Sequence, residues 1–201
     1  MSTQEVATDE RAVRASSGPV LGMVLFVASE AMFFAAFFAV YAMSYSSNGS
    51  WPPKGVDVPG LGLPTVMTIL IVLSSAFVQL GVRAVRRGDE RRLSLALAAT
   101  LVLGLAFAAL QVAGYSQVHF GIRAGTFASL FYVMSGVALA HVVGGMVFLV
   151  MVLFRSMTRH VMVMRYEPAE AAAIYWHFVV VVSVALYLAF YLVPTVTPKG
   201  T

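Results

Sequence analysis

Residues 126–154 read TFASLFYVMSGVALAHVVGGMVFLVMVLF and contain no Asp, Glu, Lys or Arg. A helix rises about 1.5 Å per residue, so about 20 apolar residues cross the ~30 Å hydrocarbon core of a membrane. The strands of a transmembrane barrel are only about 10 residues long and alternate in polarity, which this stretch does not do. The stretch therefore predicts a transmembrane helix.

Apolar runs of this kind occur five times along the chain. The whole sequence is 60% hydrophobic and 11% charged, with a mean hydropathy of +0.86. Soluble domains carry about 25% charged and 45–50% apolar residues. We therefore predict an all-α membrane protein in which residues 18–195 form one transmembrane domain of five helices. The spans are expected at about residues 20–43, 63–82, 93–115, 126–154 and 171–193.

The basic residues predict how this domain is oriented. Lys and Arg number ten on the side of the N-terminus, five of them in the charged turn 83–92, and three on the other side. Positive residues favour the cytoplasmic side, so we expect a cytoplasmic N-terminus and a periplasmic C-terminus. The polar residues 1–17 lack the features of a secretory signal and are expected to be a cytoplasmic tail. Residues 196–201 are expected to be a short outer tail.

Several classes of chemistry are excluded by composition and motif. The chain has no cysteine, which rules out disulfides, a thiol nucleophile, an iron–sulfur cluster and thiolate metal sites. The net charge of +4 is explained by loop arginines that orient the spans, so no nucleic-acid partner is expected. Phosphate-binding glycine loops, Ser-His-Asp triads and HExxH motifs are absent from the sequence. We expect no catalytic, cofactor-binding or metal-binding residues.

Glu30 is the one carboxylate inside a predicted span, ~15 Å from the start of that span. An ionised side chain at such a depth costs about 3 kcal/mol. Glu30 is therefore expected either to stay protonated or to face a polar partner, a wet cavity or a lipid headgroup. One interpretation is a carboxyl that handles protons or contacts lipid. The other is a neutral bridge between two helices.

Other polar and aromatic residues have structural alternatives. His141 lies near the middle of a span, where a lone histidine is more often a packing residue than a ligand. Trp176 and His177 lie near the cytoplasmic end of the last span and could be headgroup-level anchors, and Trp51 in the outer loop suits the membrane interface. Small residues four apart also predict close helix contacts. These are Gly136, Ala140 and Gly144, and Ala31, Ala35 and Ala39.

Three fragments carry a resemblance to a known family. They are SEAMFFA at 29–35, WPP at 51–53 and AAAIYWHF at 171–178, and they occur in this order. Together they resemble subunit III of the haem–copper cytochrome c oxidases. The similarity runs over about residues 20–193 and suits the five-helix bacterial form of the family.

This resemblance implies a role without redox chemistry in the chain itself. Subunit III packs on the catalytic subunit I, holds phospholipids between its helices and supports proton uptake and enzyme lifetime in a proton-pumping complex. Haem and copper are then expected in partner subunits, with subunit II and other respiratory subunits nearby. The chain is expected in a bacterial plasma (inner) membrane as a multi-pass protein. Glu30 matches the family's buried carboxylate, His141 the second histidine of a pair, and Trp176 with His177 the last-span signature.

The sequence also departs from the family pattern. Ala138 replaces the first histidine of the pair, Gly114 an acidic residue and Val180 an aspartate. We therefore expect a thinner polar network around Glu30, or one completed by lipid or other subunits. The four histidines and the lack of cysteine agree with a chain that builds neither a haem–copper centre nor a dinuclear copper site as the family does.

Two other functions remain open from the sequence. One is the equivalent subunit of a quinol oxidase, or the related protein that accompanies nitric oxide reductase. The other is a stand-alone proton-coupled transporter with Glu30 and His141 as its relay. Transporters usually show repeats and helices broken by Gly or Pro at the binding site, whereas prolines here avoid the span interiors.

Overall fold

The structure is a computed structural model that describes residues 18–53, 56, 60–157 and 167–196. The predicted tail 1–17 and residues 197–201 of the predicted outer tail lie outside the described residues. Within the described part, five helical segments are long and apolar enough to cross a membrane, which confirms the predicted fold class.

Each helical segment contains one predicted span and extends beyond it. The last segment changes its hydrogen-bond pattern for five residues: α6 passes into a π-helical turn, η1, and then into the short helix α7. The bounds are α2 Gly18–Ser47, α3 Gly62–Val85, α4 Glu90–Tyr115, α5 Thr126–Met157, α6 Glu167–Tyr187, η1 Leu188–Leu192 and α7 Val193–Val196.

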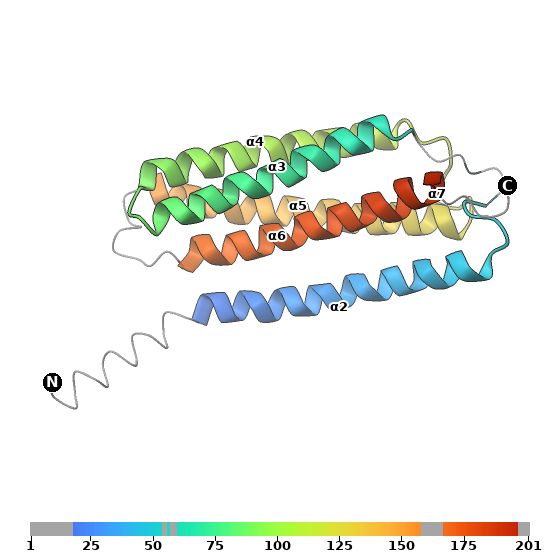
Figure 1. Cartoon of the computed structure of the whole chain (residues 1–201), viewed down its shortest axis with the longest axis horizontal. Helices are drawn as coiled ribbons and strands as arrows, with labels where there is room; N and C mark the ends of the chain where they lie inside the picture. Colours follow the sequence, from blue (N-terminus) through green and yellow to red (C-terminus); the bar gives the residue numbers. More distant parts are fainter. Residues whose placement is uncertain (1–17, 54–55, 57–59, 158–166, 197–201) are drawn as a thin grey trace, which may run out of the picture.

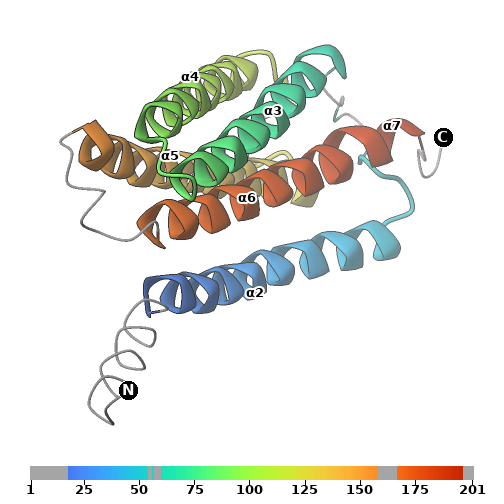
Figure 2. The same cartoon turned by 60° about the vertical axis from the view of Figure 1, so that its left-hand side comes forward.

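Helices α3, α4, α5 and α6 form a bundle, and α2 lies along one side of it (Figure 1). In both views α2 runs beside α6, while α4 lies on the far side of the bundle from α2 (Figure 2). The start of α2 and the end of α7 lie at opposite ends of the molecule, as an odd number of passes requires. We call the end with the α3–α4 turn the arginine end, and the opposite end the Trp51 end.

The α3–α4 turn is short because its residues fit a tight reversal. Gly88 has a φ of 75°, a conformation that L side chains rarely adopt. The Asp89 side chain then accepts a hydrogen bond from the Arg92 amide at 2.9 Å and so caps α4. A Cβ on Gly81 would lie 3.3 Å from the Cβ of Ala96, so the two helices approach closely near the turn.

The buried side chains form two clusters, one toward each end of the bundle. The cluster toward the arginine end is built around Trp176, Ile71, Leu97, Val142 and Leu149. The cluster toward the Trp51 end is built around Trp51, Phe127, Phe131, Met134 and Phe190.

Helix α2 contributes little to either cluster. Phe34 and Tyr41 are its buried residues. Its other faces expose large apolar side chains, such as Leu25 at 64% and Met32 at 75%. Such a surface suits lipid or another protein rather than water.

Candidate functional site

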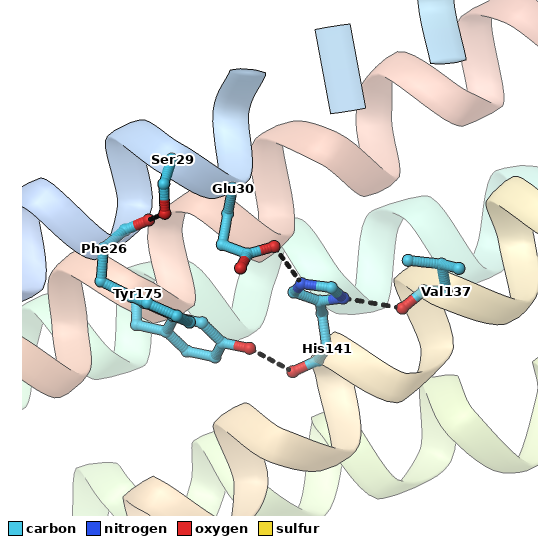
Figure 3. Close-up of polar contacts among 6 residues, drawn as sticks. All are labelled: Phe26, Ser29, Glu30, Val137, His141 and Tyr175. Atoms are coloured by element: carbon cyan, nitrogen blue, oxygen red, sulfur yellow. Dashed lines mark hydrogen bonds and ion pairs between the residues drawn. The ribbon is translucent and has the colours of Figure 1, made fainter. Parts of the chain in front are cut away.

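Glu30 and His141 meet between α2 and α5 (Figure 3). The Oε2 atom of Glu30 lies 3.0 Å from Nε2 of His141. The other ring nitrogen, Nδ1, lies 2.8 Å from the Val137 carbonyl oxygen. The His141 ring is therefore held by two hydrogen bonds, one to the Glu30 carboxyl group and one to the backbone of α5.

The hydrogen bonds of the pair define how many protons it holds. The Val137 carbonyl can only accept, so Nδ1 of His141 carries a hydrogen. The contact between Nε2 and Oε2 then contains one further proton. If that proton is on Glu30, both groups are neutral; if it is on His141, they form an ion pair. In either case the net charge of the pair is zero, which explains how a carboxyl is accommodated inside a span.

Aromatic side chains of α2 and α6 surround the His141 ring. The Phe34 ring lies edge-on to it, with centroids 5.1 Å apart, and the Tyr175 ring is stacked at 6.5 Å. The Tyr175 hydroxyl also donates to the His141 carbonyl oxygen at 3.2 Å. Three helices thus converge on the pair.

The pair lies deep in the membrane-spanning part but is not sealed. Glu30 is twelve residues after the start of α2, about 18 Å along the helix axis. The side chain of Glu30 is 23% exposed and that of His141 is 17% exposed. Part of the pair is therefore open at the side of the bundle, where a neighbouring molecule could contact it.

Trp176 is fully buried and bonds to α3. Its indole N–H donates to the Ser74 hydroxyl at 2.9 Å. The ring is in contact with the sites of two glycines, Gly104 in α4 and Gly145 in α5. The expectation that Trp176 is a headgroup-level anchor is therefore wrong, because a polar partner inside the bundle satisfies its N–H.

His177 is likewise bonded to α3. Its Nδ1 lies 2.6 Å from the Ser75 hydroxyl, and its Nε2 lies 3.1 Å from the Gln79 side-chain oxygen. Since that oxygen can only accept, Nε2 carries the hydrogen and Nδ1 accepts from Ser75. The alternative of a headgroup anchor is wrong for His177 as well, because both of its nitrogens are used within the protein.

Trp51 belongs to the buried cluster at its end of the bundle. Its side chain is 1% exposed, and its N–H donates to the Tyr41 hydroxyl at 3.1 Å. The ring packs edge-on against Tyr41 and Phe127, each at 5.3 Å between centroids. The ring is therefore enclosed by the protein rather than exposed to lipid headgroups, and the expected place of Trp51 at the level of the membrane interface stays a prediction.

Within the described residues, most of the predicted small-residue contacts are not formed; Gly144 is the exception, since a Cβ there would lie 3.4 Å from the Tyr175 hydroxyl of α6. Ala31, Ala35 and Ala39 are exposed on α2, and a Cβ on Gly136 would meet nothing within 4 Å. Close approaches occur instead at the glycines that accommodate Trp176 and at the α3–α4 crossing. The helix packing therefore depends on particular glycines opposite large side chains rather than on a regular stripe.

The structure brings two of the five predicted site residues into direct contact, Glu30 and His141. Trp176 and His177 face α3, and Trp51 lies in the other cluster. The sequence reading missed their hydroxyl partners, Ser74, Ser75, Tyr41 and Tyr175. Two adjacent serines inside an apolar span were the available signal, because buried hydroxyls in membrane helices usually bond to a neighbouring helix.

Within the described residues, no three His, Cys, Asp or Glu side chains are grouped closely enough to hold a metal ion. The Glu30–His141 pair consists of two titratable groups that share one proton.

Comparison with known proteins gives a consistent result. The family model described as "Cytochrome c oxidase subunit III" matches residues 3–194. The rat protein named cytochrome c oxidase subunit 3 is 35% identical over 176 residues, covering 85% of this chain and 67% of the relative. The protein of that name from Thermostichus vulcanus is 33% identical over 174 residues, covering 86% of each.

A match over nearly the whole chain, at these identities, leaves no large region unaccounted for. It also agrees with a structure of five helices long and apolar enough to cross a membrane, with a carboxyl–imidazole pair between two of them. The chain therefore belongs to the cytochrome c oxidase subunit III family, which lacks redox centres and is a non-catalytic subunit of an oxidoreductase complex.

Proposed function

We propose that this chain packs on the catalytic subunit I of a proton-pumping cytochrome c oxidase, near subunit II, and supports proton uptake and the lifetime of the enzyme. The observation that carries the proposal is the half-buried Glu30–His141 pair. It holds one shared proton at mid-span and is partly exposed at the side of the bundle. This proton can move between the two side chains without changing the net charge of the pair.

The same proposal places phospholipid next to α2. The outward faces of α2 are apolar along most of their length, with exposed Leu21, Leu25, Met32 and Met43. Acyl chains or a helix of subunit I would cover these side chains. The exposed alanines Ala31, Ala35 and Ala39 offer a smooth surface for close approach of such a partner.

Membrane location and orientation belong to the same proposal. The chain lies in a bacterial plasma membrane, with residues 1–17 as a cytoplasmic tail and 196–201 as a short outer tail. The support is the excess of Lys and Arg on the arginine end of the bundle, where residues 83–92, which include the α3–α4 turn, have five arginines.

Glu30→Gln tests the role of the pair. The amide can still hydrogen-bond His141, but it cannot give up or take a proton, so assembly and initial oxygen consumption should stay near the parent values. Activity should then decay after severalfold fewer turnovers. The measurement is oxygen uptake by the purified complex over many turnovers, with the haem absorbance as the check on assembly.

The matched control is Glu170→Gln, which also removes one carboxylate. Glu170 lies at the start of α6, bonded to Arg86 and distant from the pair. Its variant should keep the parent lifetime. Loss of the first turnover in Glu30→Gln would place Glu30 in the chemistry itself, and an unchanged lifetime would reduce the pair to a bridge between helices.

Purification in mild detergent tests the partner assignment. The chain should co-purify with a haem-bearing subunit, which is detected by its redox-active absorbance bands. Crosslinks from α2 should reach subunit I. A colourless preparation that runs alone and moves protons in liposomes would instead indicate the transporter.

A further inference from the structure

A groove of about 540 Å³ lies between α3 and α4 at the arginine end. Small residues form its floor, namely Ala84, Ala96 and Ala99, and the large apolar residues Phe77, Leu80 and Leu95 form its walls. Small residues line this part of the groove because α3 and α4 approach closely at Gly81 and Ala96. Figures 1 and 2 place α4 on the far side of the bundle from α2, so this groove is separate from the Glu30 site.

The lining residues follow one face of each helix. On α3 the lining includes positions 77, 80 and 84, on the following turn position 87, and on α4 positions 92, 95, 96 and 99. Phe77 and Val85 lie eight residues apart in α3, about 12 Å along the helix axis, which is most of the ~15 Å depth of one leaflet of a ~30 Å hydrocarbon core. The groove therefore follows most of one leaflet, with its apolar end toward the membrane centre.

Arginines line the mouth of the groove. Arg92 is paired with Asp89 at 3.0 Å, and Asp89 is the one acid among the lining residues. Arg83 and Arg87 are exposed, and within the described part of the chain neither has a hydrogen-bond acceptor or an ion-pair partner. Nearby Arg86 differs, because it is bonded to Glu170 at 2.6 Å. Two guanidinium groups are thus free to bind an anion at the depth of the lipid headgroups.

We propose that this groove is a binding site for one anionic phospholipid. Its phosphate lies between Arg83 and Arg87, where guanidinium groups can donate paired hydrogen bonds. One acyl chain lies along the alanine floor between Phe77 and Leu95. The two unpaired positive charges favour an anionic headgroup over a zwitterionic one. The site goes beyond the proposed role of Glu30 and depends only on α3 and α4 spanning a membrane.

Native mass spectrometry of the purified oxidase complex tests the site. The complex is stripped of loosely bound lipid and then titrated with phosphatidylglycerol or with phosphatidylcholine of the same chain length. The parent should retain at least one more phosphatidylglycerol than phosphatidylcholine. In the double variant Arg83→Gln/Arg87→Gln the affinity for that extra phosphatidylglycerol should fall about 30-fold, because two arginine–headgroup attractions are lost.

Two further variants make the test specific. Arg91→Gln removes a neighbouring exposed arginine that does not line the groove, and it should leave the titration unchanged. Ala99→Trp fills the apolar end of the groove while the arginines stay in place, and it should also displace the lipid. Haem absorbance of each preparation shows that the complex is assembled.

Three outcomes would overturn the proposal. The first is a preference for phosphatidylglycerol that is absent in the parent or unchanged in the double variant, which would show that these arginines do not select an anion. Release of the extra lipid by millimolar inorganic phosphate, with no effect of Ala99→Trp, would mean that the arginines bind a free anion. A crosslink from Arg87→Cys to a partner subunit in the lipid-free complex would assign the groove to that protein. None of these outcomes affects the result expected from the turnover test of Glu30.

Discussion

A single indole ring decides where three helices come together. Trp176 extends from α6 and bonds to Ser74 on α3. A Cβ on Gly104 would lie 2.8 Å from the ring, and one on Gly145 would lie 2.9 Å from it. Both distances are shorter than real Cβ contacts, so α4 and α5 can approach the ring only because these two positions lack a side chain.

We therefore expect Gly145→Ala and Gly104→Ala each to lower the free energy of unfolding by about 1–3 kcal/mol, the usual effect of overpacking a tight core. The neighbours cannot easily move away, because the indole is a rigid ring bonded to another helix. Thermal unfolding of the subunit in detergent, followed by helical circular dichroism, measures the change.

Gly136→Ala is the control for this pair of substitutions. Gly136 lies in the same helix as Gly145, and a Cβ there meets nothing within 4 Å. This variant should unfold at the parent temperature or slightly above it, since alanine favours helix more than glycine does. Equal destabilisation at all three positions would show that loss of glycine flexibility, and not contact with the indole, is the cause.

At the scale of helices, α2 is attached to the bundle by a few specific side chains. Toward the Trp51 end, the Tyr41 hydroxyl donates to the Ala189 carbonyl of η1 and accepts from the Trp51 N–H. The Tyr41 ring also packs against Trp51 and Phe190. One hydroxyl thus joins α2, the following loop and the last span.

Tyr41→Phe keeps the ring and leaves two buried polar groups without a partner. We expect the free energy of unfolding to fall by about 1–3 kcal/mol, because each unsatisfied buried group carries a desolvation penalty. Amide hydrogen exchange should also become faster in the last turns of α2. Exchange measured by mass spectrometry, together with thermal unfolding, checks both effects.

Ser29→Ala is a suitable comparison for Tyr41→Phe. It removes a hydroxyl from the same helix, but that hydroxyl donates to the Phe26 carbonyl within α2 (Figure 3). Exchange in α2 should therefore stay close to the parent rate. If Tyr41→Phe behaved like Ser29→Ala, the α2–η1 connection would contribute nothing measurable.

The number and type of these helices could be predicted from sequence, because apolar runs long enough to cross a membrane indicate transmembrane helices. The side chain that bonds to Glu30 could not be predicted. A helix that is apolar on every side does not reveal which face meets its neighbours, so the sequence left open whether Glu30 faces a side chain, water or lipid. The choice of His141 depends on how α2 and α5 are rotated.

The burial of the two tryptophans could not be predicted for a related reason. Trp is common at membrane interfaces because its ring is apolar and its N–H needs a polar partner. In this protein hydroxyl groups supply that partner inside the bundle, Tyr41 for Trp51 and Ser74 for Trp176. Only the three-dimensional positions of these hydroxyls distinguish the buried ring from the interfacial one.

For the whole molecule, the uneven distribution of positive charge predicts its orientation in the membrane. The arginine end includes the turn 83–92 with its five arginines, whereas the connection 44–62 at the Trp51 end has one lysine. A chain of five spans must expose these two ends on opposite sides. Positive residues resist translocation, so the arginine end should face the cytoplasm.

The lack of cysteine allows a direct test of this orientation. In spheroplasts treated with a membrane-impermeant maleimide, Ser47→Cys at the end of α2 should be labelled, because it faces the outside and is exposed. Arg91→Cys at the start of α4 is equally exposed and should react only after the membrane is broken. The parent chain should take up no label in either case. Labelling of Arg91→Cys but not Ser47→Cys in unbroken spheroplasts would reverse the orientation, and labelling of both on one side would contradict five crossings.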